Sequence, residues 1–171
     1  MSKRSLQKYL SELTEDQLRE QLMHLYTTFK DVKVYYDFVF NPREEKLVNE
    51  SKEKIANEYF PVRRKRPRAR RSVAQNYIKH FMTLGVNPLH IADIMWFNLE
   101  IAVTFNKERK FKQEAFYKSM AKSFDEGIRY CSVNGLTDEF LPRIRKVYEE
   151  VVTQNWSSLD QIERSMELLS D

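Results

Sequence analysis

The stretch that decides the fold runs from Asn87 to Phe105 and reads NPLHIADIMWFNLEIAVTF. Asn87 and Pro88 mark the start of a helix, because an asparagine side chain caps free N–H groups and proline fits the first helical turn. The apolar residues that follow lie on most sides of a helix, which is typical of a helix surrounded by others. This pattern predicts the central helix of an all-α protein.

Amphipathic helices are expected on both sides of the central helix, because apolar residues recur there at spacings of three and four. Residues 34–40 are strand-like in content but continue a helical period, so helix is favoured over strand. Capping boxes are predicted at Thr14, Ser72 and Ser158, each with a glutamine three residues later. The expected helices cover residues 6–13, 14–40, 42–60, 72–84, 89–105, 109–133, 137–151 and 158–169.

The chain of 171 residues, with 42% hydrophobic and 32% charged residues, has the composition of a globular protein. No repeated consensus is present, so we expect an irregular bundle of about eight helices rather than a solenoid. Pro61 and Pro67 interrupt any helix between residues 61 and 71. We therefore expect an N-terminal helical lobe (1–60), a basic, proline-containing connector (61–71) and a C-terminal helical lobe (72–171), or one compact domain overall.

The sequence favours a cytoplasmic location. Cys131 is the only cysteine, so no intramolecular disulfide can form, and a small buried side chain in a reducing compartment is expected. The N-terminus lacks the apolar run of a secretory signal. No stretch reaches the roughly 18 apolar residues that a membrane span requires, so no membrane partner is predicted.

The sharpest functional feature is the basic segment at residues 63–71, RRKRPRARR, which holds seven cations and no anion. Guanidinium groups bind phosphate bidentately, and an extended segment that carries several can follow a nucleic-acid backbone. No aromatic residue lies inside the run, so sequence-independent contacts without base stacking are expected. The predicted nucleic-acid-binding residues are Arg63, Arg64, Lys65, Arg66, Arg68, Arg70 and Arg71.

Other interpretations of the basic segment remain open. It is equally typical of a solvated linker, or of cations that pair with acidic helices of the same protein, such as the helix that carries Glu44, Glu45, Glu50 and Glu53. An acidic protein or an anionic lipid is a further possible partner.

A second basic cluster surrounds Phe111 and is expected at the start of a helix. Cations are unfavourable at a helix N-terminus, which suggests that an anion docks there, although Glu108 and Glu114 favour a solvated face. The residues predicted as a second nucleic-acid contact are Lys107, Arg109, Lys110 and Lys112.

Catalytic and metal-binding patterns are sparse. His90 lies three residues before Asp93 on the central helix, with Glu100 two turns later, and this order differs from the Glu-x-x-His motif of di-iron bundles. A histidine and an aspartate in the first turn of a helix are more typical of a cap and a hydrogen-bonded core group. Phosphate-loop, zinc-protease and nucleophile-elbow motifs are absent from the sequence. We predict no enzyme activity and no cofactor or metal; a metal-dependent enzyme is only a third hypothesis.

Several short features occur in order along the chain: SKRSLQKYL (2–10), LTEDQL (13–18), YYDFVFNP (35–42), EYFP with its basic continuation (58–71), and IADIM before an aromatic residue (91–95). In these features the sequence resembles an uncharacterised family of bacterial proteins known only as a domain of unknown function. The resemblance implies a bacterial, cytoplasmic, all-helical protein, and it implies no activity and no site residues.

Two functions are predicted. The first is a non-enzymatic helical protein that binds RNA, DNA or a ribonucleoprotein through the basic segment. The alternative is a protein-interaction adaptor, a homodimer or a complex with another protein, in which the basic segment is a solvated linker. The adaptor would use an apolar stripe on the 14–40 helix or on the last helix.

Overall fold

The computed structural model describes residues 2–63 and 66–169, and these residues form nine α-helices and no strand. The all-α prediction is therefore confirmed. The chain divides into an N-terminal unit (Met1–Arg43) and a C-terminal unit (Glu44–Asp171). The division lies between Arg43 and Glu44, and not at the basic segment as expected, because helix α4 (Glu44–Tyr59) packs on helices that follow that segment.

The N-terminal unit consists of α1 (Lys3–Ser11), α2 (Glu15–Thr28) and α3 (Lys30–Phe40). The predicted capping box at Thr14 is confirmed, with hydrogen bonds in both directions between Thr14 and Gln17. The single helix predicted over residues 14–40 is wrong, since Phe29 has an extended backbone that separates α2 from α3. Thr27 contributes to this break, because its hydroxyl donates to the carbonyls of Met23 and His24.

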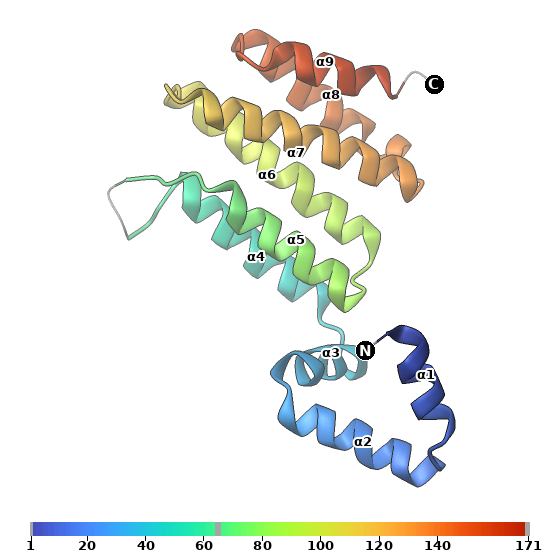
Figure 1. The fold of residues 1–171 in the computed structure, drawn as a ribbon. Coiled ribbons are helices and arrows are strands. Elements are labelled where there is room, and N and C mark those ends of the chain that lie inside the picture. Colours follow the sequence, from blue (N-terminus) through green and yellow to red (C-terminus); the bar gives the residue numbers. More distant parts are fainter. Residues whose placement is uncertain (1, 64–65, 170–171) are drawn as a thin grey trace. The chain divides into compact units, whose positions relative to one another are not determined.

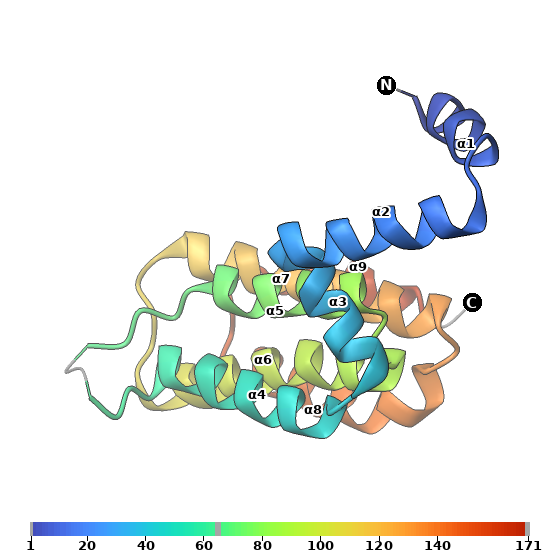
Figure 2. The same cartoon turned by 90° about the horizontal axis from the view of Figure 1, so that it is seen from below.

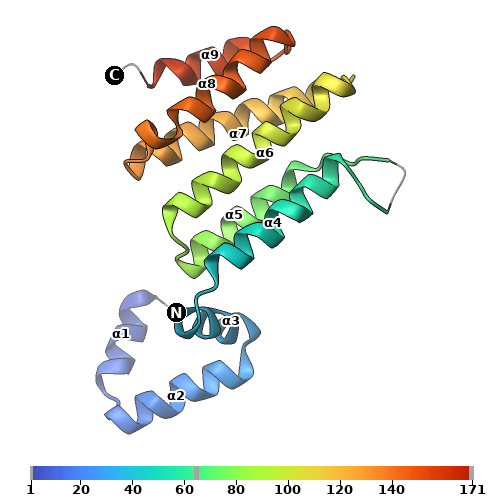
Figure 3. The same ribbon diagram turned by 180° about the vertical axis from the view of Figure 1, so that it is seen from behind.

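Helices α2 and α3 contact each other after this break (Figure 3). The Tyr26 hydroxyl donates to Asp37 across 2.8 Å, and the Tyr26 and Tyr36 rings meet edge to face. No described residue of the N-terminal unit is buried, however. The unit has local contacts but no core of its own.

The C-terminal unit is a stack of three helical pairs. They are α4 with α5 (Arg71–Leu84), α6 (Pro88–Glu108) with α7 (Glu114–Val133), and α8 (Thr137–Thr153) with α9 (Leu159–Glu167). Helices α4, α6 and α8 form one layer, and α5, α7 and α9 form the other (Figures 1 and 2). The chain reverses at each connection, so the connections after α4 and α6 emerge at the same end of the stack.

Helix α6 is central, as predicted, and contacts α4, α5, α7 and α8. Asn87 caps it, since its side chain accepts from the Leu89 amide at 2.9 Å. Trp96 of α6 is fully buried and donates through Nε1 to the Cys131 sulfur at 3.3 Å. Gly127 of α7 leaves room for the indole ring, because a Cβ there would lie 3.1 Å from it. Burial raises the pKa of the Cys131 thiol, which therefore stays protonated.

Two predicted capping boxes in the C-terminal unit are wrong. Helix α5 begins at Arg71, and no side chain caps it. Before α9, Ser158 donates its hydroxyl to the Tyr117 carbonyl at 3.0 Å instead of capping the helix. In both places, contacts outside the helix outweigh the local spacing.

The helix predicted from Arg109 begins only at Glu114. Phe111 causes the delay, because its ring packs between Phe105 (centroid distance 5.0 Å) and Phe116 (3.9 Å), and its amide donates to Asn106. Residues 109–113 therefore form a linker between α6 and α7. None of the helices in the described part of the chain is both long and apolar enough to cross a bilayer.

Candidate nucleic-acid interface

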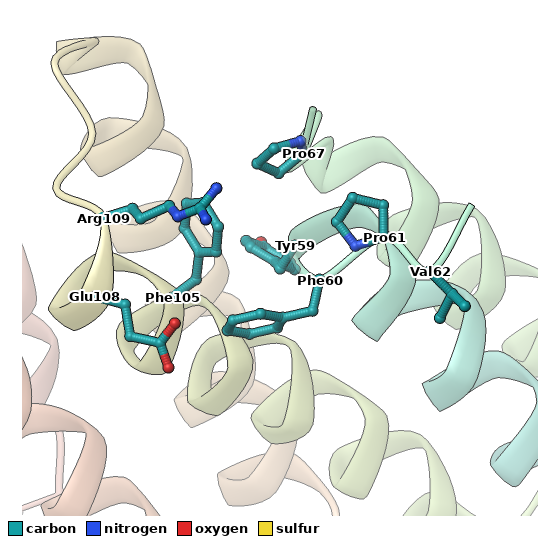
Figure 4. Close-up of a pocket in the computed structure, with 8 residues that line it drawn as sticks. All are labelled: Tyr59, Phe60, Pro61, Val62, Pro67, Phe105, Glu108 and Arg109. Atoms are coloured by element: carbon teal, nitrogen blue, oxygen red, sulfur yellow. The ribbon is translucent and has the colours of Figure 1, made fainter. Parts of the chain in front are cut away.

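The two predicted basic regions meet at one end of the C-terminal unit. The α4–α5 loop (residues 60–70) carries most of the basic segment, and the α6–α7 linker (residues 109–113) carries most of the second cluster. Both connections lie at the same end of the helical stack (Figures 1 and 2). Residues from both sides line one pocket, which brings Pro67 of the loop opposite Arg109 of the linker (Figure 4).

Glu58, in the last turn of α4, holds the far end of the α4–α5 loop. Its side chain, only 7% exposed, accepts from Arg70 through both carboxylate oxygens, at 2.9 and 3.1 Å. Its carbonyl accepts from the amides of Arg68 and Ala69 at 2.9 and 3.0 Å. We call this set of contacts the Glu58 clamp; it fixes the loop where α5 begins.

Two cations of the basic segment form ion pairs with carboxylates of the same protein. Arg70 belongs to the Glu58 clamp, and its hydrogen bond to Glu58 raises the pKa of its guanidinium. Arg71 donates to Ser123 at 2.7 Å and to Glu126 at 2.5 Å, which ties α5 to α7. Internal pairing was thus an appropriate interpretation for these two arginines, but their partners are Glu58 and Glu126 and not the acidic residues named from the sequence.

The other described cations of the basic segment are free of such pairs. Arg63, Arg66 and Arg68 have exposed side chains, and none of them forms an ion pair with another residue of the described chain. Arg64 and Lys65 lie outside the described residues. The segment therefore has two paired arginines at its C-terminal end, where α5 begins, and exposed cations earlier in the loop.

The second cluster is divided in the same way. Lys107 lies in the last turn of α6, where a cation is favourable to the helix dipole, and pairs with Glu150 at 2.9 Å. The hydrogen bond from Lys107 lowers the pKa of Glu150. The expectation of cations at a helix start is therefore wrong. Within the described chain the remaining cations of the cluster are exposed and form no ion pair: Arg109, Lys110 and Lys112.

The pocket between the two connections has an aromatic wall and a volume of about 310 Å³. Phe60 is 36% exposed, and its ring packs edge to face on Phe105 at 5.4 Å. Tyr59 lies behind it, and burial raises the pKa of its hydroxyl. Figure 4 shows Glu108 and Arg109 extending from the end of α6 toward these rings.

The sequence places Tyr59 and Phe60 beside the basic segment, but it predicted no base stacking and did not indicate that Phe60 packs on Phe105. The sequence did show that both aromatic residues lie near cations, since Phe60 directly precedes Pro61 and the basic segment, and Phe105 lies two residues before Lys107. What the spacing could not show is that the two aromatic residues pack together.

Two of the α6 residues considered for metal or acid–base chemistry, Asp93 and Glu100, belong to a charge network, whereas the third, His90, lies 3.6 Å from Glu44. Asp93 pairs with Lys52 at 2.5 Å and with Arg143 at 2.7 Å, and Arg143 also pairs with Glu100 at 2.6 Å. Burial alone would raise the pKa of Asp93, but the hydrogen bonds from Lys52 and Arg143 outweigh burial and lower it. This network joins α4, α6 and α8. Among the residues described, no three potential ligands group to hold a metal ion.

The described residues form nine helices in two units, one of them a stack of helical pairs with an exposed basic end, and this architecture defines an all-α protein. The chain belongs to the family described as a family of unknown function (DUF6155), whose model matches residues 1–170. No curated protein and no solved structure matched it. Membership of this family confirms the resemblance found in the sequence. The bacterial source that the resemblance implied stays a prediction.

Proposed function

We propose that the protein binds the phosphate backbone of nucleic acid, free or within a ribonucleoprotein, and catalyses no reaction. The contact surface is the end of the C-terminal unit formed by the α4–α5 loop and the α6–α7 linker. The observation that carries the proposal is the gathering there of exposed cations without carboxylate partners in the described chain: Arg63, Arg66, Arg68, Arg109, Lys110 and Lys112.

The physical argument rests on the division between paired and unpaired cations. Arg70, Arg71 and Lys107 already contact carboxylates, so a phosphate would gain little from them. The unpaired cations are solvated, and each that meets a phosphate releases a condensed counterion. Arginine also matches phosphate bidentately, which favours phosphate over a purely solubilising role. We also propose a cytoplasmic location, because the single thiol of the protein is buried and unpaired, as suits a reducing compartment.

The test is fluorescence anisotropy with short labelled RNA and DNA, single- and double-stranded, titrated over salt. In the loop variant, glutamine replaces Arg63, Arg64, Lys65, Arg66 and Arg68. In the control variant, glutamine replaces the same number of exposed cations elsewhere on the C-terminal unit: Lys79, Lys122, Arg145, Lys146 and Arg164.

We expect the wild type to bind with log affinity falling against log salt by about 0.7 to 0.9 per phosphate contacted. The loop variant should lose binding, whereas the control variant should keep it, because the two differ only in where charge is removed. Equal affinity of the wild type and the loop variant, or no binding by the wild type, would contradict the proposal.

A second candidate function, a protein-interaction adaptor, is favoured by the N-terminal unit. No described residue there is buried, and large apolar side chains stay well exposed. They are Leu6, Tyr9, Leu10, Leu18, Leu22, Met23, Leu25, Phe29, Tyr35, Val39 and Phe40. Exposed apolar surface of this extent is typical of interaction sites. The last helix is a poorer candidate, since Ile162 of α9 is buried and the helix packs on α7.

Light scattering of the full chain separates the forms of this second candidate. A dimer mass that reverts to a monomer when Leu18 and Leu22 are changed to Ser would support a homodimer. A monomer at all concentrations would exclude the homodimer and leave only a different protein as partner. Binding of nucleic acid is not expected to depend on these two substitutions.

A further inference from the structure

We infer that the pocket between Phe60 and Arg109 receives one unpaired nucleobase, so that the nucleic acid bound at this end is single-stranded. This inference rests on the proposed function and makes it more specific. Backbone contacts alone would not distinguish single strands from duplexes, whereas a base pocket would.

The aromatic wall is the first observation. Phe60 lies at the end of α4, where the α4–α5 loop begins, and its ring extends into the space that faces the end of α6 (Figure 4). The edge-to-face contact with Phe105 holds this ring, and Phe105 is itself held by Phe111. A fixed and partly exposed aromatic ring beside a basic loop is the usual stacking platform for single-stranded nucleic acid.

The opposite wall decides which part of a nucleotide fits. It carries the planar guanidinium of Arg109 and the carboxylate of Glu108 next to it. A phosphate in the pocket would be repelled by Glu108. A neutral base can donate its N–H groups to Glu108 and accept from Arg109, and a guanidinium plane also stacks on bases.

The pocket is large enough to admit a base. Its volume of about 310 Å³ is at the lower end of the roughly 300 to 1,000 Å³ that is common for ligand pockets. In a duplex the bases are stacked and paired, so that one base could enter only after unpairing at a free-energy cost. Meanwhile the exposed cations on both sides of the pocket, Arg66 and Arg68 in the loop and Lys110 and Lys112 in the linker, can contact the flanking phosphates.

The test uses three labelled DNA probes of the same length, about 12 nucleotides, which lies within the usual site size for such surfaces. They are an ordinary single strand, a single strand with the same phosphates but abasic sugars, and a duplex. The wild type is compared with Phe60→Leu, which keeps apolar volume without an aromatic face, and with the control Tyr77→Leu, which removes a part-buried aromatic ring on α5 outside the pocket.

We expect the wild type to bind the ordinary strand about 5- to 150-fold more tightly than the abasic strand, which is the range for stacking of one base. Phe60→Leu should bind the ordinary strand as weakly as the abasic one and leave abasic binding unchanged. Tyr77→Leu should behave as the wild type does. The duplex should bind the wild type more weakly than the ordinary single strand.

Arg109→Lys is a second variant, and it leaves the aromatic residues of the pocket unchanged. It keeps the charge but removes the planar guanidinium, and it lies on an exposed linker, so the fold should survive. It should weaken binding of the ordinary strand and not of the abasic strand. Circular dichroism confirms that each variant is folded at the temperature of the measurement.

The outcomes separate the two proposals. If the wild type binds ordinary and abasic strands equally, or binds the duplex as tightly as the single strand, the base pocket is refuted while backbone binding stands. If the wild type binds none of the probes, both proposals fail. If Phe60→Leu and Tyr77→Leu reduce binding of the ordinary strand equally, the effect does not come from this pocket and the inference is overturned.

Discussion

The N-terminal and C-terminal units are built from the same kind of amphipathic helix, yet only the C-terminal unit has a core. Helices α1 to α3 bury no residue, whereas α6 alone buries eleven. Trp96, Phe124 and Ile144 are fully buried in the C-terminal unit. Spacing of apolar residues therefore predicts that a helix forms, but not what covers its apolar face.

The two units also differ in how their polar groups are used. In the C-terminal unit, Asp93, Arg143 and Glu100 join helices that are far apart in sequence. In the N-terminal unit the described side-chain contacts are local, such as the capping box at Thr14 and the bond from Tyr26 to Asp37. A segment of about 40 residues seldom buries enough surface to be stable without help, so we expect the N-terminal unit to gain order from a partner.

The largest expected effect compares a core residue with an exposed apolar one. Trp96→Ala should lower the free energy of unfolding by about 3 to 5 kcal/mol, because it leaves a large cavity beside Gly127 and Phe124. Leu22→Ala on α2 should change it by less than about 0.5 kcal/mol. Urea unfolding followed by circular dichroism measures both, and similar costs would show that the N-terminal unit has a core after all.

The next effect concerns the Glu58 clamp. Glu58→Gln should cost about 1.5 to 3 kcal/mol, the usual worth of hydrogen bonds to a buried charged group. It should also speed cleavage of the α4–α5 loop by trypsin, because Arg70 loses its charged partner. Glu20→Gln, on an exposed face of α2, should do neither. Unchanged proteolysis in Glu58→Gln would mean that the clamp does not hold the loop.

A pH titration tests the charge network around Asp93. Since its folded pKa lies below the ordinary value of 3.8, the network stabilises the protein above that pH, and the stabilisation is lost as pH falls through the lowered pKa. Asp93→Asn should therefore cost about 1.5 kcal/mol at pH 7, and the cost should shrink in acid. Asp16→Asn, at a side chain that is 95% exposed, should follow the wild-type curve. A cost for Asp93→Asn that is independent of pH would contradict the assigned charges.

The smallest expected effect compares two helix caps. Asn87→Ala removes the cap of the central helix and should cost about 1 kcal/mol of global stability. Thr14→Ala removes an equivalent cap in the N-terminal unit and should reduce helix content without moving the unfolding midpoint of the C-terminal unit. Calorimetry and circular dichroism together separate these results. A shift of that midpoint by Thr14→Ala would show that the two units unfold together.

Local signals in the sequence predicted much of the fold. Apolar spacing located the helices, Asn87 and Thr14 marked two helix starts, and the position of Cys131 indicated a buried thiol. One prediction failed for a local reason, the break between α2 and α3 at Phe29, and others failed where a contact outside the helix outweighed local spacing. Phe111 delays α7 because it packs between two other rings, and Ser158 bonds to Tyr117 instead of capping α9.

The candidate interface was predictable to a similar degree. A run of arginines is visible in any sequence, so the basic segment could be found directly. Its pairing with Glu58 and Glu126, and the meeting of Phe60 with Phe105, depend on how the chain reverses after α4 and α6. Such contacts join residues that no sequence spacing relates.

The Glu58 clamp has a further consequence, which concerns entropy. It closes the loop between Glu58 and Arg70, which lie 12 positions apart in the sequence, in the free protein. A closed loop samples fewer conformations than an open one, and its ordering is then a cost of folding and not of binding. Arg66 and Arg68 consequently occupy a restricted volume in the free protein, and under the proposed function this restriction would lower the entropy cost of binding a polyanion.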